Sequence, residues 1–297
     1  MSQQVETEPM ATVTKIMTED DFLDDVRKSI DSRIPLDLSG YTVTLTKGAI
    51  RLRGTEQLEI HGGIIEGPIH SLFQIDGDKK LNPRRLTLRN STLRHTKVHE
   101  DSRQIGAAIF AMGSCVVVLE NCDISSKGGF AIWGKHRCHI TVDNCQIHDV
   151  ARTAVACFNE CHVIVRNTTM VNVGIHGVCG RAVSVMEIFH CTMQHCATRA
   201  VMVYEGAQLT LEDCVISGTG DPTTPTIHAQ GPSETDSKES HGDEKKIEAA
   251  TTKSKGANFK AMIPTLVMRR CKVQNSAGTS LLIEGQVEAE ISQNEII

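Results

Sequence analysis

The 297-residue sequence predicts an all-β solenoid, a fold in which short strands recur at a fixed spacing and stack along one axis. Two observations lead to this fold class. A pattern centred on a polar residue, most often Asn, recurs every 23 residues through the middle of the chain. Around each copy lie short runs of alternating apolar residues with no helical periodicity between them, which is typical of strands. With 40% apolar and only 3% aromatic residues, the core must be filled by Val, Ile, Leu, Ala and Cys.

The repeat is clearest between residues 142 and 180. The stretch VDNCQIHDVARTAVAC, residues 142–157, is followed 23 residues later by VRNTTMVNVGIHGVCG, residues 165–180. The aligned polar positions along the chain are Asn90, Asn121, Asn144, Asn167, His190, Asp213 and Arg270. We expect these residues to turn the chain, because Asn and Asp tolerate the left-handed backbone conformation that a tight bend requires.

A second series of small residues starts another short strand in each period. Its members are Ala108, Ala131, Ala154, Gly177, Ala200 and Ser280. Each period therefore holds about three short strands, joined by bends too short for a crossover helix. This pattern indicates a parallel β-helix, in which coils of about 23 residues stack ~4.8 Å apart and equivalent residues form columns.

Eleven cysteines fall largely within these columns. The predicted internal stacks are Cys122, Cys145, Cys191, Cys214 and Cys271, interrupted by Thr168, and Cys115, Cys138 and Cys161. No secretion signal is visible and no pair has the CxxC spacing of a metal site, so we expect free thiols that pack as small apolar side chains. The sequence predicts neither a metal nor another cofactor.

We expect one domain with an N-terminal cap. Residues 1–17 are predicted to be disordered, 18–38 to form a capping helix and its lead-in, and 39–297 to form the β-helix. The helix would begin at Thr18 as N-cap and bury Phe22, Val26 and Ile30 against the open end of the stack. The first two coils would start near Tyr41 and Leu58. A polar, charged insertion at 231–262 is predicted to be a disordered loop within the β-helix.

Charge and hydropathy narrow the classes of partner. A net charge of −5 and a pI near 6.2 offer no general basis for binding nucleic acid or an anionic membrane. The sequence contains neither an apolar segment of signal-peptide type nor an apolar run of about 18 residues. We therefore expect a cytoplasmic protein, with the nucleus and the cytoskeleton as alternatives.

The sequence resembles the pectin-lyase-like superfamily of right-handed parallel β-helices. The resemblance covers about Ser39 to Ile297 and rests on motifs such as NCDI, NCQI and HCTM, followed by AIWG, AVAC and AVMV. Its closest likeness in character is to the intracellular β-helix domains of Shc-binding spindle proteins and F-box proteins. This implies a right-handed β-helix and leaves the function open, because the fold carries lyases, hydrolases, epimerases and adhesins.

No catalytic residues are predicted. The resemblance implies that β-helix polysaccharide enzymes carry clustered carboxylates, and hydrolysis needs two carboxyl groups within roughly 5–10 Å. Here Asp149 is followed in its column by Asn172 and then His195, so no acidic column forms. We expect a non-enzymatic scaffold that binds a protein partner, possibly one of the cytoskeleton or spindle as the resemblance implies. The alternative is a carbohydrate-active lyase, hydrolase or epimerase acting on an acidic polysaccharide.

A binding groove is predicted on the edge where two bends are lengthened, by about eight residues before Ala108 and about three after Asp213. The predicted groove residues are Lys127, His148, Asp149, Arg152, Asn172, His176, His195 and Arg199. Asp149, Asn172 and His195 would form one column, and Thr153, His176 and Arg199 another. Arginine forks and imidazoles suit an acidic peptide, a phosphate or a glycan. The simpler interpretation is that these are solvated bends.

The opposite bend and the single tryptophan offer less. The opposite bend carries side chains of both charges, so we expect exposed ion pairs that contribute little to stability. Its residues are Lys135, Arg137, Asn159, Glu160, Arg181, Tyr204 and Glu205. For Trp133 we favour packing in the core over stacking on a ligand. A pure glycan-binding module would need exposed aromatic rings, and the chain has only one Trp and two Tyr.

Overall fold

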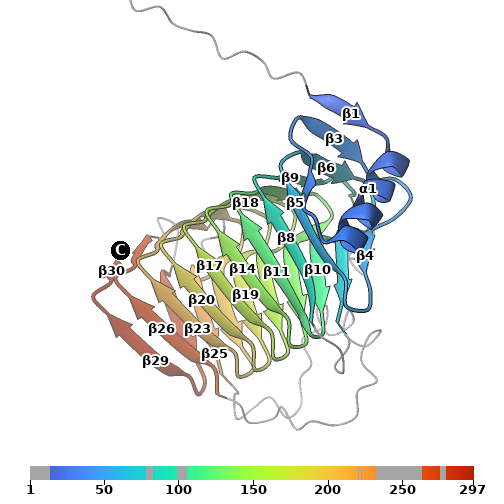
Figure 1. Ribbon diagram of the computed structural model, residues 1–297. Coiled ribbons are helices and arrows are strands. Elements are labelled where there is room, and N and C mark those ends of the chain that lie inside the picture. Colours follow the sequence, from blue (N-terminus) through green and yellow to red (C-terminus); the bar gives the residue numbers. More distant parts are fainter. Residues whose placement is uncertain are drawn as a thin grey trace, which may run out of the picture.

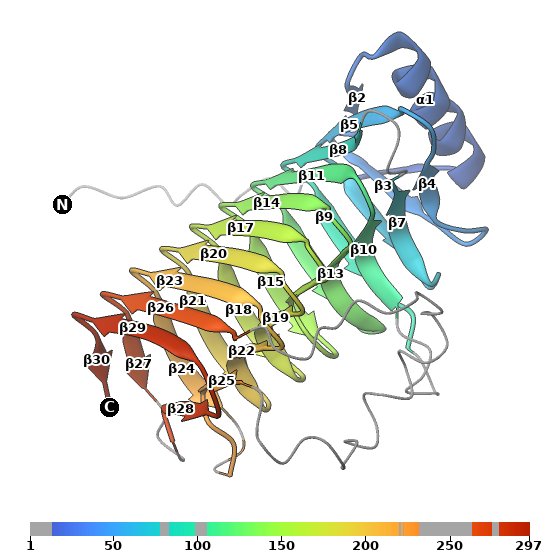
Figure 2. The same ribbon diagram turned by 90° about the horizontal axis from the view of Figure 1, so that it is seen from below.

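A computed structural model describes residues 14–77, 83–98, 106–219, 221, 223–231, 263–274 and 279–297. Within these ranges the chain forms one helix and three parallel sheets that wind around a common axis (Figures 1 and 2). The predicted parallel β-helix with an N-terminal helix is confirmed. Helix α1 lies at one end of the stack and the C-terminus at the other. No helix in the described ranges is both long and apolar enough to cross a lipid bilayer.

Each complete coil contributes one strand to each sheet. Sheet A consists of β1 (Lys15–Met17), β3 (Tyr41–Thr44), β6 (Ile64–Gly67), β9 (Thr92–His95), β12 (Asp123–Ser126), β15 (Gln146–Val150), β18 (Thr169–Val173), β21 (Thr192–Cys196), β24 (Val215–Thr219), β27 (Lys272–Gln274) and β30 (Glu295–Ile296). Sheet B consists of β2 (Leu36–Asp37), β5 (Gln57–His61), β8 (Arg84–Arg89), β11 (Cys115–Glu120), β14 (His139–Asp143), β17 (His162–Arg166), β20 (Val185–Phe189), β23 (Gln208–Glu212), β26 (Thr265–Arg269) and β29 (Glu288–Ser292). Sheet C consists of β4 (Ile50–Leu52), β7 (Ser71–Asp76), β10 (Gly106–Met112), β13 (Gly129–Lys135), β16 (Val155–Phe158), β19 (His176–Arg181), β22 (Arg199–Tyr204), β25 (Ile227–Gln230) and β28 (Leu281–Glu284).

The strand register reproduces the repeat seen in the sequence. In sheet A, Ile124 pairs with Ile147, Ile147 with Met170, and Met170 with Met193. Each step is one coil of 23 residues. Because these pairings are parallel and in register, each of these side chains lies above its equivalent in the coil before.

The corner between sheets B and A is formed by the predicted Asn column. All members have a left-handed backbone, including Asn121 at φ 53°, Asn144 at φ 51° and Arg270 at φ 51°. Where the column holds Asn, the side chains form a ladder: Asn144 Nδ2 donates to Asn121 Oδ1 at 2.6 Å, and Asn121 Nδ2 donates to Asn90 Oδ1 at 3.1 Å. The amides therefore connect successive coils at this corner.

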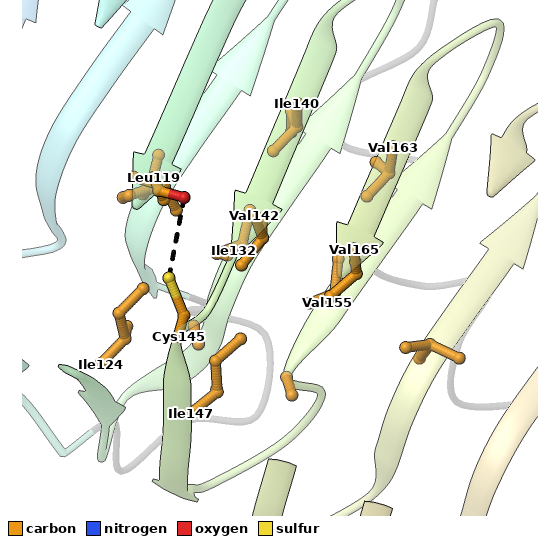
Figure 3. Close-up of a cluster of buried hydrophobic side chains, with 14 of the residues drawn as sticks. Leu119, Ile124, Ile132, Ile140, Val142, Cys145, Ile147, Val155, Val163 and Val165 are labelled. Carbon is orange, nitrogen blue, oxygen red and sulfur yellow. Dashed lines mark hydrogen bonds between the residues drawn. The ribbon is translucent and has the colours of Figure 1, made fainter. Parts of the chain in front are cut away.

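The core runs along the axis and is filled by aliphatic and sulfur-containing side chains, several of which are shown in Figure 3. All eleven cysteines are free and buried, and both predicted stacks are present. Cys122 N lies 3.3 Å from Cys145 Sγ, and Cys145 N lies 3.3 Å from Thr168 Oγ1. Thr168 fits the sulfur stack because its hydroxyl accepts the same kind of hydrogen bond from the neighbouring coil.

Helix α1 (Glu19–Ser32) covers the first coils. Thr18 is its N-cap, since its Oγ1 accepts from Asp21 N at 3.1 Å. Phe22 and Val26 are buried in the main core, and Ile30 packs against it. The Glu19 carboxylate accepts from Thr46 N at 3.0 Å and Lys47 N at 2.9 Å, which ties the helix to the loop after β3.

The predicted domain boundaries differ from the structure at the N-terminus. Disorder was expected through residue 17, whereas Lys15–Met17 form β1 and pair with β3. Pairing decides this segment, because β3 would otherwise present an open sheet edge. Residues 1–13 and 232–262, which include nearly all of the predicted loop at 231–262, lie outside the described residues. Gly231 itself still belongs to the coil, because its N donates to Glu284 O at 2.7 Å.

Candidate functional site

A shallow depression lies at the corner where the chain passes from sheet A to sheet C. Its volume is about 460 Å³, and we call it the corner depression. Its lining residues are Val98, Lys127, Asp149, Val150, Ala151, Asn172, Val173, Gly174, His195 and Ala197. The residues come from four successive coils and from the lengthened bend that contains Val98. Four of the predicted groove residues, Lys127, Asp149, Asn172 and His195, are therefore brought together.

The rim of the corner depression is a column of left-handed polar residues. Asp149, Asn172 and His195 have φ values of 50°, 56° and 53°. This geometry bends the chain out of sheet A and leaves the three side chains exposed. Asn172 Nδ2 donates to Asp149 Oδ1 at 3.2 Å, so two of the three residues of the column predicted from the 23-residue spacing are hydrogen-bonded to each other.

Ionised Asp149 is held by its neighbours. The hydrogen bond from His148, followed by that from Asn172, keeps the pKa of the Asp149 carboxyl below its usual value, and the charge of Lys127 acts in the same direction. His148 bonds Asp149 Oδ2 at 2.9 Å and Asp123 Oδ1 at 2.7 Å. Burial lowers the pKa of His148, but the two carboxylates outweigh it and the net shift is upward. His148 thus supports the rim without lining the depression.

Floor and rim of the corner depression differ in polarity. Val150 and Val173 are buried beneath it, at 2% and 1% exposure, whereas Ala151, Gly174 and Ala197 are exposed. Small residues at these positions leave room for an incoming group. The arrangement of an apolar floor and a polar rim is typical of surfaces that bind a side chain of a partner.

The remaining predicted groove residues form a separate group at the start of sheet C. His176 pairs in register with Arg199, and Ile175 N, in the neighbouring coil, donates to Arg152 O at 2.6 Å. None of the three residues Arg152, His176 and Arg199 lines the corner depression. The predicted groove residues therefore do not all line one site. The bend between Asp149 and Arg152 separates two adjoining sites because the chain turns there from one sheet to the next.

A further histidine, missed by the sequence analysis, belongs to this second group. His228 lies in β25, pairs in register with Met202 and is only 5% exposed. The 26-residue step from Met202 to His228 departs from the usual spacing, which hid the alignment. We call Arg152, His176, Arg199 and His228 the cationic cluster. Burial, followed by the charges of Arg199, Arg152 and His228, lowers the pKa of His176 to about 3.

Trp133 lies on the outer face of sheet C, not in the main core. Its ring centroid is 4.9 Å from that of Phe110, 4.9 Å from that of Phe130 and 6.4 Å from that of Phe158. Lys135 Nζ lies 5.6 Å from the Trp133 ring centroid. The prediction that Trp133 packs in the core is therefore wrong, since Trp133 packs in a separate aromatic cluster on the outer face. The 23-residue spacing of Phe110 and Trp133 was the signal that could have revealed it.

The opposite bend carries the expected ion pairs. Arg137 pairs with Glu160, and Arg181 pairs with Glu205 through Nε at 2.6 Å and Nη2 at 3.1 Å. The Arg181 guanidinium also lies 5.3 Å from the Tyr204 ring centroid. These side chains satisfy one another. In the part of the chain that the structure describes, no group of three or more His, Cys, Asp or Glu is arranged to hold a metal ion.

The fold defines this chain as a parallel β-helix protein. The family model described as "Right handed beta helix region" matches residues 71–241, more than half of the chain, and the chain belongs to this family. Among solved structures it is similar to the A-module of mannuronan C-5 epimerase AlgE4 from Azotobacter vinelandii. The two share 12% identity over 96% of this chain and 92% of that chain, with a TM-score of 0.39. No curated protein sequence matches the chain. The likeness to Shc-binding spindle and F-box proteins stays a prediction.

Proposed function

We propose that this chain is a non-enzymatic scaffold that binds a protein partner at the corner depression. The observation that carries the proposal is the depression itself, with buried Val150 and Val173 beneath it and the bonded Asp149–Asn172 row at its rim. Such a site suits an apolar side chain of a partner flanked by hydrogen-bonding groups. We place the protein in the cytoplasm, with the nucleus and the cytoskeleton as alternatives.

Rigidity supports a scaffold role. The depression is built from consecutive coils whose strands pair in fixed register on both sides, for example Val150 with Val173 and Val173 with Cys196. A partner would therefore meet a preformed surface and would not have to order it, which reduces the cost of binding. None of the depression's lining residues is Trp, Tyr or Phe, so the site lacks the rings that a stacked sugar would need.

The proposal is tested by filling the depression. Ala197→Arg places a long charged side chain at an exposed lining position, and Gln146→Arg makes the same kind of change at an exposed position on sheet A outside the depression. The intact chain is used to capture partners from a cell lysate, each partner is purified, and its dissociation constant is measured by calorimetry. We expect Ala197→Arg to weaken binding at least about tenfold, equivalent to about 1.4 kcal/mol, and Gln146→Arg to leave it unchanged.

Equal affinity of the Ala197→Arg variant would show that the depression is not the contact surface. The carbohydrate-active alternative is tested on the same preparation with polygalacturonate. A lyase or hydrolase would lower the viscosity of the polymer, and an epimerase would change its proton NMR spectrum. Either change at a rate proportional to protein concentration would contradict the non-enzymatic scaffold.

A further inference from the structure

We propose that the cationic cluster (Arg152, His176, Arg199 and His228) binds a phosphate monoester, carried by a phosphorylated side chain of the protein partner. The inference takes the existence of a partner from the proposed function and adds a second recognition site. The cluster adjoins the corner depression, since Arg152 follows directly after Ala151 of its lining. One partner segment could therefore occupy both sites.

Backbone pairing places the two arginines on either side of one histidine. Ile175 N donates to Arg152 O at 2.6 Å, and Arg199 N donates to Ile175 O at 3.2 Å, so Arg152 and Arg199 lie two coils apart with His176 between them. Two steps of coil stacking separate their backbones by ~10 Å. Both side chains are long enough to converge on a group held between them, and guanidinium groups match the oxygens of a phosphate.

Two buried nitrogen atoms in the cluster have no hydrogen-bond partner among the described residues. One is the donor Nε of Arg199, and the other is Nδ1 of His228, which becomes a donor when the imidazole is protonated. His228 is 5% exposed, and its Nε2 is already bonded to Glu284 Oε2 at 2.8 Å. Leaving buried donors without acceptors is destabilising, and such groups commonly mark the place of a ligand. An anion with several acceptor oxygens would accept from Arg199 Nε directly, and from His228 Nδ1 once that ring is protonated.

The acidic neighbours do not neutralise the cluster. Glu284 is engaged with His228, and Asp221 is engaged with Thr223, whose N lies 2.8 Å and whose Oγ1 lies 2.6 Å from Asp221 Oδ1. The hydrogen bonds from Thr223 lower the pKa of Asp221 more than the charge of Arg199 does. The guanidinium of Arg199 therefore stays available to an external anion.

The size of the cluster favours one compact oxyanion over a charged polymer. Towards the N-terminus its column continues with Thr153, Phe130 and Ala107, which carry no charge. A uronate chain carries a carboxylate on each sugar and would need cations repeated along the axis. A phosphate monoester concentrates close to two negative charges and several acceptor oxygens on one atom, which fits two arginines and two imidazoles.

Protonation should be linked to binding. The pKa values of His176 and His228 are both lowered, mainly by burial, so that both imidazoles are uncharged at neutral pH. The charged groups that face them are Arg152, Arg199 and Glu284. An arriving dianion would favour protonation of either ring, and binding would then take up a proton. Affinity for the phosphate monoester should consequently rise as the pH is lowered from 8 towards about 6.5, where the ester, with a second pKa of about 6, is still mostly a dianion.

The test uses the full chain and two probes, inorganic phosphate and a mixture of phosphoserine peptides, titrated by calorimetry at constant ionic strength. We expect both to bind, unphosphorylated peptides not to bind, and Arg199→Gln to weaken binding at least tenfold. Arg137→Gln, on the opposite bend, is the matched control and should have no effect. Arg199→Lys, which keeps the charge but not the fork, should give an intermediate loss. Thermal melting confirms that each variant is folded.

Unchanged phosphate affinity in Arg199→Gln would overturn the inference, as would tighter binding of oligogalacturonate than of phosphopeptides at this site. The two proposals can fail separately. If Ala197→Arg loses the captured partner but phosphate does not bind the intact chain, only the phosphate site fails. If phosphate binds through Arg199 but Ala197→Arg keeps its partner, only the corner depression fails.

Discussion

At the scale of single residues, the corners of the coil differ in how well their residues tolerate a left-handed backbone. The left-handed column between sheets B and A contains His190, Asp213 and Arg270 as well as Asn, with φ values of 53°, 54° and 51°. The coil therefore imposes this geometry, and Asn is the residue that suits it best. At the corner between sheets C and B, Val183 has a φ of 48°, which is unfavourable for a β-branched side chain.

Replacing Val183 should stabilise the protein. Its equivalent one coil later is Gly206, with a φ of 79°, and one coil earlier is Glu160. We expect Val183→Asn to raise the free energy of unfolding by about 1 kcal/mol, because Asn tolerates the left-handed conformation. Val185→Asn, two residues on in β20, is the control and should lower it, since strand conformation favours Val. Urea denaturation measures both; a lower midpoint for Val183→Asn would contradict the strain.

His176 should make the protein sensitive to acid. The unfolded imidazole titrates near pH 6.5, whereas the folded one resists protonation to about pH 3. Stability is therefore complete above about pH 6.5 and is lost, at about 1.4 kcal/mol per pH unit, as the pH falls towards 3. His176→Thr copies Thr153 of the preceding coil and should remove this part of the pH dependence. Urea midpoints at pH 7.5 and 5.0, in phosphate-free buffer, provide the comparison; equal slopes in the two proteins would exclude His176 as the source.

At the scale of elements, helix α1 and strand β1 protect the first coils. The helix is stabilised by its Thr18 cap and by Glu19, whose hydrogen bonds reach the loop after β3. Its apolar face contributes Phe22 and Val26 to the same core that the sheets enclose. Strand β1 pairs with β3 and so covers an edge that would otherwise be open. Helix and strand together close the N-terminal end of the stack.

Truncating the helix anchor should destabilise this end. Phe22 is fully buried, so Phe22→Ala should cost about 3–5 kcal/mol, and Thr18→Ala about 1 kcal/mol through loss of the cap. Hydrogen exchange should show faster exchange in α1 and in β3, with β17 and β20 unaffected. Arg27→Ala, at an exposed position of the helix, is the control and should change little. Uniform acceleration across all coils would mean that the helix is not a separate cap.

At the scale of the whole molecule, the stacked coils bury every cysteine of the chain. Burial raises the pKa of Cys191 to about 11 and that of Cys196 to about 12. The thiolate is the reactive form, so buried thiols with raised pKa values react slowly. All eleven cysteines are buried, so a thiol reagent reaches them only slowly while the stack is intact.

Thiol labelling should follow global unfolding. With Ellman's reagent at pH 8 we expect less than one thiol per chain to react rapidly in the native protein and all eleven to react in denaturant. Partial urea concentrations would reveal whether coils unfold together or in blocks, as expected for a solenoid whose repeats contact only their neighbours. Rapid labelling of several thiols under native conditions would show that the core is open to solvent.

The sequence by itself determined the repeat and the columns of equivalent residues that the repeat produces. The 23-residue register, the Asn corner, the sulfur stacks and the Asp149–Asn172–His195 column follow from spacing, because a parallel coil places equivalent residues directly over one another. Only the tertiary structure decided where the side chains of each corner lie relative to the adjoining sheets. Only the structure shows that the corner depression and the cationic cluster are separate, that His228, from a coil of irregular length, belongs to the cluster, and that Trp133 lies on the outer face. These positions depend on the exact bend between sheets, which the spacing of residues in the sequence does not specify.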